Sequence, residues 1–187
     1  GEAVKTVFWG FFLILLNFNL SFNSHVLNLL PDFAGYLLLY RAGEALAEEN
    51  RRFGQLRPFE MGMAVYTGLL WAGDLLGVTS SGPVSTLLGL AAAVVALLIS
   101  WNVVQAILEM EAARGADLNG ASVRGAWFVL LAAQIVGYAA VRLLSAGLGL
   151  LVGIAGLVGI LWFLAALWRC AKCWEGLRPA GGGPELL

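Results

Sequence analysis

Three charged side chains stand apart from every other charge in the sequence, and they are its best candidates for chemistry. The chain holds 11 Lys and Arg and 12 Asp and Glu. All but three of these fall in four patches, at the N-terminus, at 41–60, at 109–124 and from 169 onward. The exceptions, Asp32, Asp74 and Arg142, lie in long apolar stretches. A charge in such surroundings costs at least ~2.5 kcal/mol inside a membrane unless it is paired or hydrated. Two acids and one base therefore predict a paired cluster.

Each of the three charges also has a plain structural explanation, and the sequence leaves both interpretations open. Pro31-Asp32 suits the first turn of a helix, where proline is tolerated and an acid favours the dipole. Asp74 comes shortly before Gly77 and can lie among lipid headgroups. Arg142 can extend its long side chain to the interface.

The expected cluster has polar neighbours that complete a pocket for a small solute or ion. They come from the first two spans, the loop between them and the fifth span: His25, Asn17, Asn28, Gln134 and Tyr138. The alternative for His25 is a solvated loop histidine, because it lies between Ser24 and Val26 in a short connection.

The composition is that of a membrane protein. Sixty per cent of the 187 residues are apolar, 12% are charged and the mean hydropathy is +0.83, whereas soluble domains have about 25% charged residues. A membrane span takes ~20 mostly apolar residues, so the chain has room for six. We therefore expect an all-α fold, a polytopic membrane helix bundle embedded in the lipid bilayer. The net charge of −1 gives no reason to expect a nucleic acid partner.

The apolar runs predict six transmembrane helices arranged as three hairpins. The expected spans are about 4–20, 28–46, 59–76, 84–108, 125–144 and 148–170. Residues 1–178 then form one transmembrane domain, and 179–187 form a flexible tail rich in glycine and proline. Similar segments starting at Tyr40, Trp101 and Trp168 suggest a threefold repeat. The alternative is that any helix leaving a bilayer shows an interfacial aromatic followed by polar residues.

The distribution of Lys and Arg predicts the orientation. All of them except Arg142 fall at the two ends of the chain, in 41–57 or in 114–124. Cytoplasmic loops carry the excess of Lys and Arg, so both termini and these two loops are expected in the cytoplasm. The first residues lack a basic region and a small-residue cleavage pattern, so the first apolar run is interpreted as a span rather than a signal peptide.

The second span is expected to continue beyond the membrane as a polar helix. Good helix formers follow Tyr40, and Glu48 and Arg52 stand at the i, i+4 spacing of a helical ion pair. The extension is expected to end at Phe53-Gly54, with Pro58 preceding the third span.

Amides and glycines in the later spans predict packing contacts. Asn102, Gln105 and Gln134 are expected to form hydrogen bonds between helices. Small residues four positions apart, as at Gly149/Gly153 and Ala155/Gly159, let helices approach closely. This contact lies either within the chain or in a homo-oligomer through Gly149, Gly153, Gly156 and Gly159.

No motif for catalysis, a cofactor or a metal is present in the sequence, so an enzyme is not the expected function. Cys170 and Cys173 form a C-x-x-C pair without the second pair that structural zinc needs. A single histidine leaves little for acid–base chemistry.

One short segment resembles a known group of proteins. Residues 26–37 contain Leu30-Pro31-Asp32-Phe33 followed by Gly35-Tyr36. This leucine-proline-aspartate-aromatic-x-glycine-tyrosine segment resembles one in small bacterial multipass membrane proteins of unassigned function. The resemblance implies a bacterial cytoplasmic membrane and brings no activity or ligand.

The sequence is consistent with two functions. The first is a small transporter or channel-like protein, with an outward-facing pocket at Asp32, Asp74 and Arg142. The second is a scaffold, sensor or accessory subunit that acts through its charged loops, chiefly 41–60 and 109–124. A structure in which the hairpins enclose the three charges would favour the first.

Overall fold

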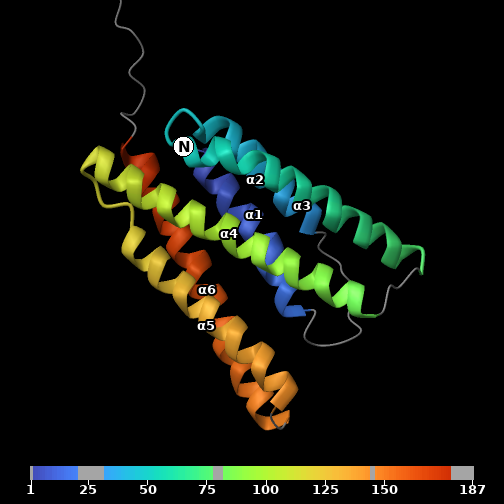
Figure 1. Ribbon diagram of the computed structural model, residues 1–187. Helices are drawn as coiled ribbons and strands as arrows, with labels where there is room; N and C mark the ends of the chain where they lie inside the picture. The colour runs from blue at the N-terminus through green and yellow to red at the C-terminus, as the bar shows by residue number, and fades with distance from the viewer. Residues whose placement is uncertain (1, 21–31, 78–81, 144–145, 178–187) are drawn as a thin grey trace, which may run out of the picture.

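A computed structural model of the chain describes residues 2–20, 32–77, 82–143 and 146–177. Within these residues the fold is all-helical and has six helices (Figure 1). They are α1 (Glu2–Leu20), α2 (Asp32–Leu46), α3 (Arg51–Leu75), α4 (Pro83–Arg114), α5 (Gly120–Leu143) and α6 (Ala146–Leu177). The predicted helical class is confirmed.

The region between the second and third helices differs from the prediction. Helix α2 ends at Leu46, a turn covers 47–50, and α3 already begins at Arg51. The backbone N–H of Arg52 donates to Asn50 Oδ1 at 2.9 Å, so Asn50 caps the start of α3. The expected extension of α2 to Phe53-Gly54 was therefore wrong. Pro58 lies inside α3 rather than before it.

The helices also extend further toward the charged patches than the apolar runs indicated. Helix α4 continues to Arg114 and α6 to Leu177. A helix need not end where its apolar residues end, because its backbone hydrogen bonds lie within the helix and do not depend on apolar side chains. Gly115 then stops α4 in the left-handed conformation, with φ 59°.

The packing of the helices does not support a division into three hairpins. Helix α2 packs extensively against both α1 and α3, and α5 packs extensively against α6. Helix α3 packs more extensively against α2 than against α4. Helix α4 packs against α3 and α5, and both of these interfaces are small. Helix α1 joins the two groups because it also packs against α6.

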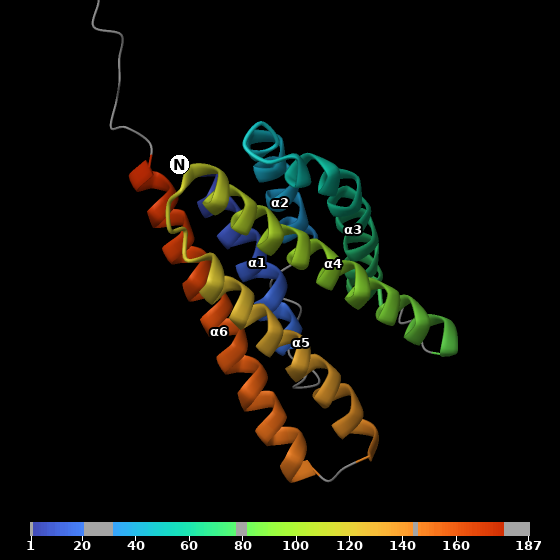
Figure 2. The same ribbon diagram turned by 60° about the vertical axis from the view of Figure 1, so that its left-hand side comes forward.

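The six helices are close together at one end of the molecule and separate at the other (Figures 1 and 2). We call the first the charged end: it contains the start of α1, the turns 47–50 and 115–119, and the end of α6. At the opposite end α3 and α4 form one tip, and α5 and α6 form another. The two tips lie apart in both views.

Burial follows the same division. The apolar residues that are almost fully buried on α4 begin at Ile99, and the 83–91 part of this helix is exposed wherever its side chains are described. Large apolar side chains are exposed along the rest of α4 and near both tips. Examples are Leu87, 66% exposed, Leu69, 69% exposed, and Leu150, 68% exposed. So much exposed apolar surface is typical of a protein surrounded by lipid.

Three of the described helices are long and apolar enough to cross a membrane. These segments are Thr86–Arg114, Gly120–Ala139 and Gly149–Leu177. Helix α2 is short, with 15 residues, and the first turns of α3 contain several charges. The prediction of a membrane protein is thus supported by three helices, and the six-span arrangement remains a proposal.

Candidate functional site

The structure places the three isolated charges at the ends of helices. Asp32 is the first residue of α2, Asp74 lies in the last turn of α3, and Arg142 lies in the last turn of α5. All three positions are at the helix ends that point away from the charged end. Asp32 is half-buried. The side chains of Asp74 and Arg142 lie outside the described residues.

The helix packing places two of these positions on one helix pair and leaves the third on another. Helices α2 and α3 are antiparallel neighbours joined by the turn 47–50, but α2 has 15 residues and α3 has 25. Phe33 packs beside Gly68 and Trp71, so Asp32 lies short of the α3–α4 tip that holds Asp74. Arg142 is at the end of α5, whose partners among the described residues are α4 and α6. Contacts between helices therefore do not by themselves assemble the predicted cluster.

The other predicted pocket residues are only partly described. His25 and Asn28 lie outside the described residues. Asn17 belongs to α1, but its side chain is also outside them. On α5, Gln134 is half-buried and Tyr138 is 48% exposed. One turn apart on the same helix, these two residues lie on the approach to the α5–α6 tip.

Side chains at the charged end connect the turn 47–50 to α4. Glu109 accepts hydrogen bonds from Asn50 Nδ2 at 2.9 Å and from Arg52 Nε at 2.8 Å. Arg52 Nη1 also donates to Asn102 Oδ1 at 2.8 Å, which confirms the predicted interhelical role of Asn102. Arg52 thus pairs across the molecule with α4, and not with Glu48 as the sequence spacing suggested.

A second set of contacts joins α6 to the other helices at this end. Glu49 and Arg114 form an ion pair, and the Arg114 guanidinium lies over the Trp174 ring at 4.8 Å. Lys5 Nζ is 2.8 Å from Glu175 Oε1, which joins α1 to α6. Ion pairs therefore connect the helices at the charged end, around its buried apolar core.

The turn 115–119 is fixed by one carboxylate. Glu111 Oε2 accepts the backbone N–H of Leu118 at 2.9 Å and that of Gly120 at 3.0 Å. Asn119, which has a positive φ of 63°, donates from Nδ2 to the Ala166 carbonyl at 3.3 Å. These bonds hold the start of α5 on α6.

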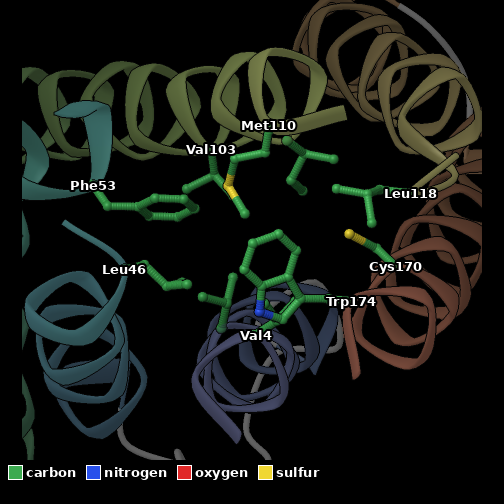
Figure 3. Close-up of a pocket in the computed structure, with 10 residues that line it drawn as sticks. Val4, Leu46, Phe53, Val103, Met110, Leu118, Cys170 and Trp174 are labelled. Carbon is green, nitrogen blue, oxygen red and sulfur yellow. The ribbon is translucent and has the colours of Figure 1, made fainter. Parts of the chain in front are cut away.

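A small apolar cavity lies inside the charged end (Figure 3). Side chains from α1, α2, α3, α4 and α6 point into it, including Val4, Met110, Cys170 and Trp174. Its volume of about 10 Å³ is that of about one water molecule. Its lining is apolar, so it is a packing defect rather than a substrate site. The apolar contacts around it close this end of the bundle.

The structure also shows a buried acid that the sequence analysis did not single out. Glu60 is 1% exposed, and its Oε2 has no hydrogen-bond partner. It lies on the face of α3 that Phe53, Leu56 and Met63 bury in the core. The signal was available in the sequence, because 53, 56, 60 and 63 have helical spacing. Counting Glu60 within the charged patch 41–60 concealed it.

The glycines of α6 divide into two groups. A Cβ on Gly159 would lie 3.1 Å from Val129 Cγ1, so this glycine allows close contact with α5. Gly156 faces Ala133, where a Cβ would be 3.9 Å away. Gly149 and Gly153 have open space around them. The predicted close packing is therefore present within the chain at Gly159, and an oligomer through these glycines stays a prediction.

Comparisons of the chain with protein-family models, with curated proteins and with solved structures find no match. The candidate site must be interpreted from its own geometry.

Proposed function

We propose that the chain is a small integral membrane protein with six transmembrane segments that binds and moves a small solute or ion. The observation that carries this proposal is the contrast between its two ends. Ion pairs and apolar packing close the charged end, whereas the helices separate toward the other end (Figure 2). A bundle closed on one side and separated on the other is the arrangement expected of a carrier that exposes its site to one side at a time.

The distribution of charges supports an orientation for this carrier. The charged end contains nearly all the Lys and Arg, so it faces the cytoplasm of a bacterial cell in this proposal. Both termini are then cytoplasmic, and the two tips face outward. The exposed apolar side chains of α3, α4, α5 and α6 contact lipid.

The solute site in this proposal lies between the tips. Asp32 and Asp74 provide negative charge on the α2–α3 pair, and Arg142 provides positive charge on α5. The amide of Gln134 and the hydroxyl of Tyr138 add uncharged hydrogen-bonding groups. Groups of both signs on separate tips suit a zwitterion or another small polar solute that bridges them.

The charged end offers less to a partner protein than its composition suggested. Several of its charges already have partners within the chain. Arg52 pairs with Glu109 and Arg114 pairs with Glu49. Glu111 accepts a backbone N–H group. A surface whose charges are already paired has weaker attraction for a charged partner. This observation favours transport over a scaffold that acts through 41–60 and 109–124.

A thermal-shift screen of the purified protein tests the proposal, with amino acids, small organic acids, sugars and monovalent ions as probes. A bound solute raises the unfolding temperature. We expect Asp32→Asn, Asp74→Asn or Arg142→Gln to remove that shift. Arg124→Gln is the matched control, because Arg124 is on α5 near the charged end. Uptake of the same solute into proteoliposomes then measures transport.

Two outcomes contradict the proposal. Retention of every shift in all three variants removes these residues from the site. Binding without uptake into proteoliposomes removes transport, and leaves a sensor or accessory subunit as the function.

A further inference from the structure

Glu60 has surroundings that do not suit a permanent negative charge. Its side chain is on the core-facing side of α3, and Oε2 has no hydrogen-bond partner. Oε2 faces α2 at Gly43, where a Cβ would be only 3.5 Å away. An isolated carboxylate in such a place has lost its water without gaining a partner, and the neutral acid is the form that burial tolerates.

The nearest cation is one helical turn away and is occupied elsewhere. Arg57 precedes Glu60 by three residues, a spacing that makes neighbours on a helix. Its Nη2 is 3.5 Å from Glu44 Oε2, and its guanidinium lies over the Tyr40 ring at 4.1 Å. Its Nε is buried and has no hydrogen-bond partner. The Arg57 Nε–H donor and the Glu60 Oε2 acceptor thus lie on adjacent turns, and neither makes a hydrogen bond.

The polar groups that neighbouring helices bring to this part of α3 come from α2 and α4. Helix α2 contributes Tyr40 and Glu44 to the surroundings of Arg57 and Glu60. Helix α4, the other helix packed against α3, contributes Glu109, which is bound by Arg52 and Asn50. Among the described residues, Arg57 is therefore the cation with which Glu60 can pair.

We propose that Glu60 is a proton-binding site and that loss of its proton moves Arg57 from Glu44 to Glu60. In the protonated state Glu60 is neutral and Arg57 stays with Glu44 and Tyr40, as the structure has it. In the deprotonated state the proton passes to solvent water beside the half-buried Arg57. The carboxylate then accepts the Arg57 Nε–H, which satisfies both unused groups.

The exchange changes the connection between α2 and α3. Glu44 and Tyr40 are on α2, whereas Glu60 is on α3 with Arg57. Binding of Arg57 to Glu60 therefore replaces contacts between the two helices with a contact inside one. This consequence does not depend on transport, so the inference stands or falls independently of the proposed function.

Nuclear magnetic resonance of the arginine Nε–H groups tests the proposal in detergent micelles. The signal of Arg57 is assigned by its loss in Arg57→Gln. We expect this signal to shift with pH in a single transition in the wild-type protein. The transition should be lost in Glu60→Gln, which mimics the protonated acid. It should be unchanged in Glu48→Gln, which removes an exposed carboxylate near the same end.

A second variant keeps the proposal testable if Glu60→Gln does not fold. Glu44→Gln removes the competing partner of Arg57 and leaves Glu60 in place. We then expect the transition to remain and to move to lower pH, because Arg57 is released more easily. An infrared band of a protonated carboxylic acid should disappear over the same pH range in the wild-type protein.

Three results overturn the proposal. The first is an Arg57 signal that does not change with pH. The second is a transition that persists in Glu60→Gln, which would assign it to another group. The third is loss of the transition in Glu44→Gln while Glu60 is intact.

Discussion

The two ends of this protein use polar residues in opposite ways. At the charged end, acids and bases pair across helices and fix how α1, α3, α4 and α6 meet. At the other end, single charges occupy the last turns of α3 and α5 on separate tips. The part of this molecule with the most charges is thus also the part where the helices are most closely connected. The isolated charges lie at the end where the proposed solute site is expected.

The largest expected effect comes from removing the buried ring at the charged end. Trp174 is 2% exposed and packs beside the cavity and under Arg114. We expect Trp174→Ala to lower the free energy of unfolding by about 3–5 kcal/mol. The measurement is reversible unfolding in mixed micelles.

Leu87→Ala is the control for that comparison, because Leu87 is at the α3–α4 tip and is 66% exposed. Its expected effect is within about 0.5 kcal/mol. Equal losses in the free energy of unfolding from Trp174→Ala and Leu87→Ala would show that the two ends do not differ in stability.

A smaller effect is expected from the carboxylate that holds the turn 115–119. Glu111→Ala leaves the backbone N–H groups of Leu118 and Gly120 without their acceptor. We expect a loss of roughly 2 kcal/mol in the free energy of unfolding. Hydrogen exchange at these two amides should also become faster.

Glu48→Ala is the matched control for Glu111, since Glu48 is an exposed carboxylate near the same end. A loss as large in this variant would mean that the total negative charge is important, rather than the two backbone hydrogen bonds.

The smallest expected effect is that of the exposed ion pair. A double-mutant cycle with Arg52→Ala and Glu109→Ala should give a coupling energy of about 0.2–1 kcal/mol. The pair is partly exposed, with side chains 36% and 48% exposed, so added salt should reduce the coupling. A coupling that salt leaves unchanged would place this pair in a drier environment than the structure has.

The helices were largely predictable from the sequence, because their apolar runs are long. The ends of the helices were less predictable, as the start of α3 shows. Pro58 was interpreted as a boundary, yet α3 includes it because the Asn50 cap starts the helix earlier. The pairing of Arg52 with Glu109 was not predictable, because it depends on how α4 crosses the turn 47–50. Glu60 was predictable from its spacing with Phe53 and Leu56.

The length of α4 has a consequence for the membrane itself. Its 32 residues span about 48 Å, whereas the hydrocarbon core of a bilayer is about 30 Å thick. The 83–91 part of α4 has almost no protein cover that could shorten its contact with lipid. Residues 83–108 of α4 carry no charge and alone span about 39 Å, so in a bilayer this part of the helix would tilt, or thicken the bilayer around it. The angle between the α3–α4 tip and the rest of the molecule is thus expected to follow lipid chain length.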